Sequence, residues 1–181
     1  MQIKLIHPNI RLALPQENNN EFIRHASCCN KIEAVSLLLS DSRVDPSAEN
    51  NEAIRHASCH GHVEMTRLLL SDSRVDPSTN DNEAIRQASY YGYAVIVSLL
   101  LADSRVDPAA RNNEAIRKAS HFGHVETVKL LLADSRVNPA AEDNWAIRDA
   151  SHRGYIEIVN LLLADSRVRL AIKDSEIANV Y

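Results

Sequence analysis

The sequence is poor in glycine, in aromatic residues and in cysteine. Its 181 residues include only 4 glycines, 3 cysteines, 5 tyrosines, 2 phenylalanines and 1 tryptophan. With so few aromatic rings, a core must be built from Leu, Ile, Val and Ala. Two of the cysteines, Cys28 and Cys29, are adjacent, and an odd number of cysteines does not make a disulfide framework.

The sequence also lacks a secretion signal, a membrane span and the basic charge that is typical of polyanion binders. There is no Asn-x-Ser/Thr glycosylation acceptor, and residues 1–14 are interrupted by charged residues and a proline, so no apolar run is long enough for a secretion signal or a membrane span. A net charge of −4 and a pI near 6.0 argue against a dedicated nucleic-acid or membrane-surface binder. We expect an intracellular protein, cytoplasmic or nuclear, that acts as a monomer without nucleic-acid or membrane partners.

Near-copies of one 31-residue unit fill most of the chain. The asparagine that opens each unit recurs at Asn20, Asn51, Asn82, Asn113 and Asn144. A period of this length indicates a stacked array in which each unit buries its apolar face against its neighbours. The units span residues 20–50, 51–81, 82–112, 113–143 and 144–168.

Each unit contains two short helical patterns. In the fourth unit, the apolar residues between Ala115 and Ala119, and then between Val125 and Leu132, recur at helical spacings. Gly123 separates them, and a glycine or Asn30 holds this position in every unit, as suits a left-handed turn. A loop with turn chemistry follows, with a lone Val that could sit in a short strand. Helices this short are stable only within the stack.

The stretch Ala119–Leu132, Ala-Ser-His-Phe-Gly-His-Val-Glu-Thr-Val-Lys-Leu-Leu-Leu, resembles the ankyrin-repeat pattern Ala-Ala-x-x-Gly-His-x-x-x-Val-x-x-Leu-Leu. All five units carry it to some degree, over residues 20 to about 168. Glu114-Ala-Ile-Arg117 replaces the family's Thr-Pro-Leu-His, and the unit is shorter than usual, a variant that resembles ankyrin arrays of giant viruses and some protists. The resemblance implies an all-α ankyrin-type helix-turn-helix solenoid of five repeats with short hairpin-like loops.

The two ends depart from the repeat. Residues 1–19 lack the helical pattern and are interpreted as an extended N-terminal cap. Residues 169–181 align with the start of a degenerate sixth unit and are interpreted as a C-terminal cap. Atypical terminal units are expected, because their outer faces meet water.

Five sets of positions in the first helix vary between units. Each set has i, i+3, i+4 spacing and so occupies one helix face. The ankyrin resemblance implies that this face is concave and grips a partner, and that loop-tip residues such as Arg111 border it. Exposed aromatic residues such as Tyr90, Tyr91 and Phe122 mark interaction patches. The predicted partner-binding residues are His25, Cys28, Cys29, His56, Cys59, His60, Gln87, Tyr90, Tyr91, Arg111, Lys118, His121, Phe122, Asp149, His152 and Arg153.

Two columns of arginine do not vary. One contains Arg24, Arg55, Arg86, Arg117 and Arg148, and the other contains Arg43, Arg74, Arg105, Arg136 and Arg167. Such columns can grip a polyanion or a lipid headgroup. However, a glutamate three residues before most members of the first column predicts pairing within the helix, and an aspartate flanks each member of the second. We expect both columns to be structural.

The sequence shows no Ser-His-Asp or Cys-His catalytic constellation and no phosphate-binding loop, so we expect neither an enzyme nor a cofactor. His25, Cys28, Cys29, His56, Cys59 and His60 offer ligands for a zinc site, but no Cys-x-x-Cys is present. The leading hypothesis is a scaffold that binds another protein without catalysis. The alternatives are a polyanion or headgroup binder and a metal-dependent module.

Overall fold

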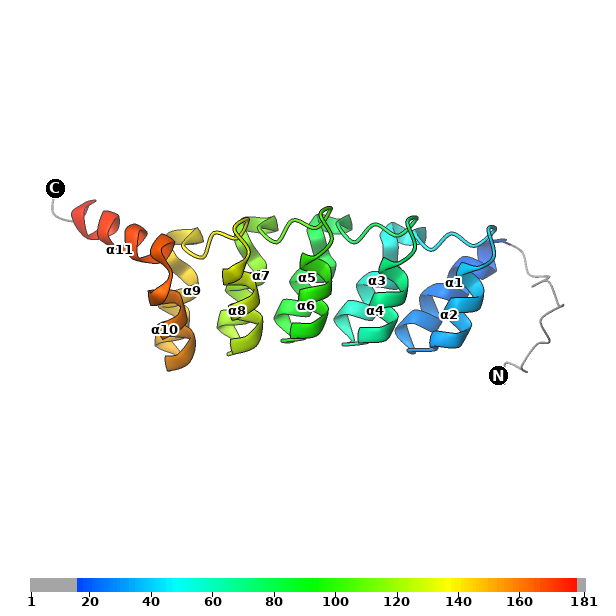
Figure 1. Ribbon diagram of the computed structural model, residues 1–181, viewed down its shortest axis with the longest axis horizontal. Helices are drawn as coiled ribbons and strands as arrows, with labels where there is room; N and C mark the ends of the chain where they lie inside the picture. Colours follow the sequence, from blue (N-terminus) through cyan, green and yellow to red (C-terminus); the bar gives the residue numbers. More distant parts are fainter. Residues whose placement is uncertain (1–15, 179–181) are drawn as a thin grey trace.

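The computed structural model describes the backbone of residues 16–178 and the side chains of residues 19–173. Within that range all regular secondary structure is helical, and there are no strands (Figure 1). The predicted all-α solenoid is therefore confirmed, and the lone Val of each loop is buried without joining a strand. The helices are α1 (Gln16–Cys28), α2 (Ile32–Leu39), α3 (Ala48–Cys59), α4 (Val63–Leu70), α5 (Thr79–Tyr90), α6 (Ala94–Leu101), α7 (Ala110–His121), α8 (Val125–Ala133), α9 (Ala141–His152), α10 (Ile156–Ala164) and α11 (Ser166–Ala178).

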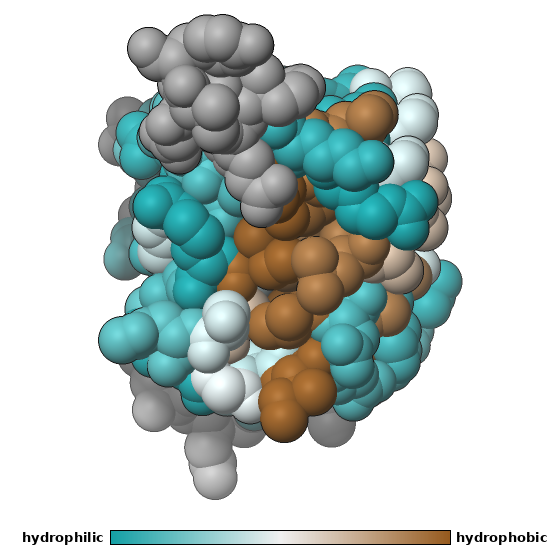
Figure 2. Space-filling model, turned by 90° about the vertical axis from the view of Figure 1, so that its left-hand side faces the viewer, coloured by the Kyte–Doolittle hydropathy of each residue, from teal (hydrophilic) through white to brown (hydrophobic). Residues whose placement is uncertain are grey.

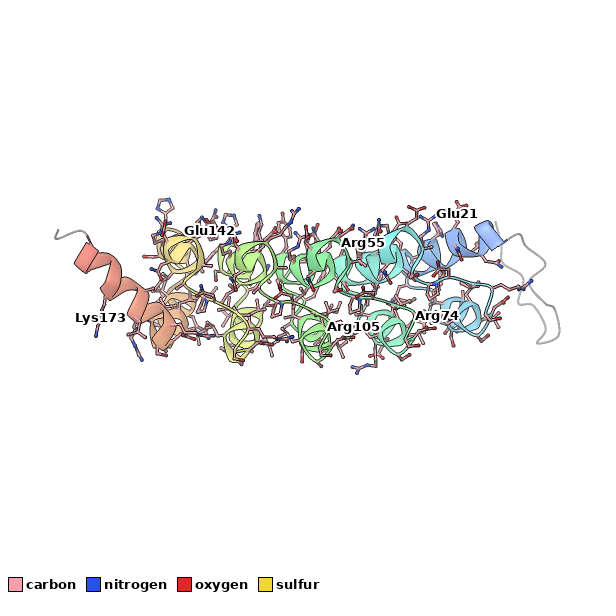
Figure 3. The ribbon with its side chains drawn as sticks, turned by 90° about the horizontal axis from the view of Figure 1, so that it is seen from above. Glu21, Arg55, Arg74, Arg105, Glu142 and Lys173 are labelled. Carbon is pink, nitrogen blue, oxygen red and sulfur yellow. The ribbon has the colours of Figure 1, made fainter. Side chains whose placement is uncertain are left out.

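The helices form two rows. The first helices of the repeats (α1, α3, α5, α7, α9) make one row and the second helices (α2, α4, α6, α8, α10) the other, with the long loops along one edge (Figures 1 and 3). Neighbouring first helices contact each other more extensively than neighbouring second helices do. Figure 3 shows the rows running side by side with little curvature. The surface on the first-helix side is therefore long and shallow.

The core between the rows is aliphatic, as the composition predicts. The largest fully buried side chains are Ile, Leu, Val and Met, and no aromatic side chain is among them. The same positions recur from repeat to repeat, as in Ile54, Ile85 and Ile116. Each repeat thus adds one layer to a continuous core, which fits nearest-neighbour stacking.

The turn between the two helices of each repeat has the predicted left-handed backbone. Gly92 has φ +75° and Asn30 has φ 54°. A Cβ on Gly92 would lie 2.5 Å from the imidazole of His124 in the next repeat. His124 Nε2 in turn donates to the carbonyl of Tyr90 at 2.9 Å, and His62 makes the equivalent bond to Cys28. The turn glycine therefore admits a ring that joins two repeats, and both histidines have a structural role.

A left-handed segment that the sequence analysis did not foresee opens the first helices of repeats two to five. Three consecutive residues there, such as Glu49, Asn50 and Asn51, have φ of 54–57°. Asn and Asp tolerate this conformation better than other residues with a side chain, which explains why they fill the second and third positions. At the first position only Asn80 is such a residue. The others there are Glu49, Arg111 and Glu142.

The first arginine column holds this left-handed segment and joins it to the next repeat. Arg86, whose residue exposure is 8%, donates to the carbonyls of Asn80 and Asp81 at 3.1 and 2.8 Å and to Glu114 Oε2 at 2.8 Å. The predicted pairing within the helix is wrong, because the glutamate partners of Arg24, Arg55 and Arg86 lie 28 residues further along, in the next repeat. These pairs are Arg24–Glu52, Arg55–Glu83 and Arg86–Glu114.

The second arginine column ties the loops together. Arg105 pairs with Asp103 at 2.6 Å and reaches back to the carbonyl of Val75 in the preceding repeat at 2.7 Å. Arg74, Arg136 and Arg167 repeat both contacts, and Figure 3 shows Arg74 and Arg105 beside the second-helix row. The hydrogen bond from arginine lowers the pKa of Asp103 and of its equivalents Asp72, Asp134 and Asp165. The predicted structural role of this column is confirmed for these four residues.

Both ends differ from the predicted caps. Helix α1 begins at Gln16, so residues 16–19 are helical rather than extended, and residues 1–15 lie outside the described range. The predicted C-terminal cap is helical in α11 as far as Ala178, because Arg169-Leu170 replaces the Asn-Pro that ends the equivalent segment of the fourth repeat. The buried Asn144 Oδ1 consequently has no hydrogen-bond partner, whereas Asn113 Oδ1 accepts from the backbone of Asn138.

No further repeat covers the outer face of the fifth repeat in the described range. Figure 2 looks at this end and shows an apolar strip flanked by polar surface. Ile156, at the start of α10, is 71% exposed, whereas Val125 at the equivalent position of the fourth repeat is half-buried. Leu163 and Leu170 are also exposed. The packing of one further repeat therefore changes the first position of the second helix from exposed to half-buried.

Replacing Arg86 with Ala should lower the free energy of unfolding by about 2 kcal/mol, since Glu114 and two carbonyls lose a charged donor. The matched control is Arg148→Ala. Arg148 is exposed and donates a long hydrogen bond to the Glu142 carbonyl at 3.4 Å, so its loss should change stability by less than about 0.5 kcal/mol. Urea denaturation of both variants tests the difference, and equal effects would contradict the proposed role of the first column.

Glu49→Asn should raise the free energy of unfolding by about 0.5–1 kcal/mol, because Asn adopts the left-handed conformation with less strain. The reciprocal substitution Asn80→Glu, one repeat later, should lower it by a similar amount. Thermal melting of both variants provides the measurement. A change of the same sign in the two would show that backbone conformation is not the cause.

Acid should weaken the loops. Because the folded pKa of Asp103 lies below its unfolded value of about 4, its carboxylate stabilises the fold above that value, and this contribution is lost as pH falls through the folded pKa. Asp103→Asn should therefore be less stable than the parent at neutral pH, and the difference should shrink below about pH 4. Glu33→Gln, at an exposed position of α2, should show no such trend. Denaturation across pH measures both.

Candidate functional site

The predicted partner-binding residues of the first two repeats lie on the first-helix side as separate small groups. Cys29 Sγ approaches His25 at 3.8 Å, while His60 Nδ1 donates to the carbonyl of His56 at 2.8 Å. His56 also lies 3.5 Å from Glu52. These side chains are short or polar and contact mainly their own helix, so they provide no extended apolar surface.

From the third repeat onward the rings form a continuous row. The ring centroids of Tyr91 and Tyr90 are 4.7 Å apart, and those of Tyr90 and Phe122 are 4.4 Å apart. Phe122 contacts His121 at 4.5 Å, and His121 stacks on Trp145 at 5.8 Å. We call these five residues the aromatic patch. Tyr91 is 46% exposed and Phe122 38% exposed, so the patch is open to solvent while its rings support one another.

A closed set of hydrogen bonds borders the aromatic patch. His121 Nδ1 lies 2.9 Å from Asp149 Oδ2, and Arg153 donates to the same oxygen at 3.0 Å. Arg153 Nη2 also lies 3.0 Å from His121 Nε2. This arrangement fits the neutral histidine that donates from Nδ1 and accepts at Nε2. The imidazole is thus held at one edge of the patch, in contact with both an anion and a cation.

The remaining predicted residues surround the patch. Lys118 Nζ lies 5.8 Å from the centre of the Tyr90 ring, within the range of a cation–π contact. Arg111 pairs with Asp81 at an exposed loop tip, at 3.1 Å. His152 lines a shallow open depression with Ile147, Arg148 and Ser151. Gln87 and Cys28 are half-buried in the same row of helices.

Trp145 is a member of the aromatic patch that the sequence analysis missed. It stands where the other repeats have glutamate, namely Glu21, Glu52, Glu83 and Glu114. The guanidinium of Arg117 lies 5.6 Å from the centre of its ring, in place of the ion pair made at the preceding interfaces. The interruption of the glutamate column was visible in the sequence and was the available signal.

The alternative sites find no support in the geometry. Among the described residues no group of three or more His, Cys, Asp or Glu side chains is placed to hold a metal ion. Burial raises the pKa of the Cys59 thiol, the opposite of what an activated nucleophile requires. Arginines of both columns donate to backbone carbonyls and carboxylates of the protein, which does not favour polyanion binding along them.

The two-row stack of helix pairs, each joined to the next by the same contacts, defines a helical-repeat protein. A family model described as ankyrin repeats (3 copies) matches residues 85–174, and the first two repeats carry the same unit. Residues 85–174 belong to the ankyrin-repeat family, as the sequence pattern indicated. No curated protein matches the chain. No helix in the described range is long and apolar enough to cross a membrane.

Proposed function

We propose that this chain binds one partner protein without catalysis, through the first-helix side, with the aromatic patch as the centre of the interface. The family supports this, because ankyrin repeats are in general modules of protein–protein interaction and are typically non-enzymatic. The observation that carries the proposal is the continuous row of half-exposed rings over the third, fourth and fifth repeats.

The energetics of interfaces favour this location. Binding energy is concentrated in a few residues, and Tyr and Trp are over-represented among them. The rings of the patch are already in contact with one another, so little side-chain entropy is lost when a partner covers them. The exposed large apolar residues of the second-helix side are Leu37, Val95, Ile156 and Leu163. All four are aliphatic, so they provide no aromatic cluster.

Replacing Tyr91 or Phe122 with Ala should weaken capture of the partner by about 2 kcal/mol for each key ring while the melting temperature changes little. The measurement compares capture from cell extract and thermal melting for the same preparations. The matched controls are Leu37→Ala and Val95→Ala, which remove apolar side chains of similar exposure from the opposite side, and which should leave capture unchanged.

Two results would contradict the proposal. If melting falls sharply and capture only follows the loss of folded protein, the rings belong to the core. If the control variants reduce capture as much as Tyr91→Ala or Phe122→Ala, the second-helix side is the binding surface.

A further inference from the structure

The substitution of Trp145 for glutamate changes the charge of the binding face. At the earlier interfaces, such as Arg86–Glu114, a carboxylate of the next repeat neutralises the arginine. At the last interface the Trp145 ring covers Arg117 instead and brings no negative charge. Arg117 keeps its bonds to the carbonyls of Arg111 and Asn112, so it remains in place with its charge uncompensated.

Other cations gather at the same place. Arg117, Lys118 and Arg148 make no ion pair with a carboxylate among residues 19–173, the part of the chain whose side chains are described. Arg153 pairs with Asp149, which it shares with His121. We call Arg117, Lys118, Arg148 and Arg153 the cationic rim. It has four positive charges, against the carboxylates of Glu142, Asp143 and Asp149 on α9.

Most other carboxylates of these two repeats have partners elsewhere. Glu114 pairs with Arg86, and Glu142 accepts from Asn112. The carboxylates on the second-helix side and in the loops are paired with Lys129, Arg136 and Arg167. Asp143 is exposed at a loop tip. Apart from Glu114, which pairs with Arg86, the first helices of the last two repeats carry the four cations of the rim against the three carboxylates of α9, whereas the whole chain carries a net charge of −4.

We propose that the partner presents an acidic segment to this face, an inference that rests on the function proposed above. Its carboxylates lie on the cationic rim while an apolar side chain of the same segment lies on Tyr90, Tyr91 and Phe122. Lys118, which touches Tyr90, places charge and apolar contact side by side. Complementary charge at a rim of this kind increases the association rate and selects against basic partners.

A peptide fits this surface better than a nucleic acid does. Nucleic-acid binders present basic residues along a stripe or groove that follows the phosphate backbone. Here the cationic rim lies on the first helices of the last two repeats, together with Asp149, and the arginines that recur along the stack are bonded within the protein. A cluster beside aromatic rings suits a short segment of mixed acidic and apolar residues.

The test uses a display library of random peptides selected on the immobilised, folded chain. Enriched sequences are expected to carry net negative charge together with an aromatic or large aliphatic residue. Synthetic peptides from the selection are then measured by fluorescence anisotropy. Exchanging their Asp and Glu for Asn and Gln should weaken binding about tenfold or more, and added salt should weaken binding of the acidic forms only.

Trp145→Glu is the informative variant, because it restores the repeat's own residue and provides Arg117 with a carboxylate. It should remain folded and bind the acidic peptides about three- to tenfold more weakly, with a smaller effect on their neutral forms. Ser98→Glu is the matched control. It adds the same charge at an exposed position of α6 on the opposite side and should leave binding unchanged.

The outcomes separate the inference from the proposed function. Neutral or basic peptides that bind and lose affinity in Phe122→Ala would overturn the acidic preference and leave the binding face intact. No enrichment, or binders indifferent to Phe122→Ala, would overturn both. If a labelled single-stranded oligonucleotide binds more tightly than the selected peptides, the ligand of this face is a polyanion and not an acidic peptide.

Discussion

The guanidinium group of the first arginine column is the interaction on which the stack depends. Each left-handed segment leaves carbonyls that no helix can satisfy, and each repeat is too short to be stable alone. Arg86 satisfies these carbonyls and also joins two repeats, because it donates to the carbonyls of Asn80 and Asp81 and to Glu114 of the next repeat. A conformation that is strained in isolation thereby becomes the joint between repeats. The second arginine column adds a tie between successive loops at the other row.

Much of this architecture was predictable because the repeat presents the same evidence five times. The spacing of apolar residues and the glycine between them predicted two helices and a left-handed turn, and both are present. The partner of Arg86 was not predictable in the same way. The sequence alone allows two partners, namely Glu83, three residues before Arg86 on the helix, and Glu114 in the next repeat. Only the packing of one repeat on another brings Glu114 within 2.8 Å.

The binding face was also predictable from the sequence only in part. Variation between repeats identified Tyr90, Tyr91 and Phe122 as candidates, since columns that hold the stack together repeat their residue and these do not. The row of rings continues through His121 to Trp145. This continuation depends on distances between side chains, which the sequence alone does not give. The interruption of the glutamate column at Trp145 was visible in the sequence, but its meaning depends on the place of Arg117 over the ring.

The exchange of glutamate for Trp145 also explains how this stack can change its surface charge without losing its joint. A largely buried ion pair gains little net stability, because desolvation offsets most of the attraction between its charges. A cation–π contact contributes about 0.5–2 kcal/mol, which is a comparable amount. Arg117 retains its two carbonyl acceptors in either case, so the left-handed segment stays clamped. The interface between the fourth and fifth repeats is thus a position where the residue facing the arginine can vary at little cost to stability, and where the charge on the binding face changes with it.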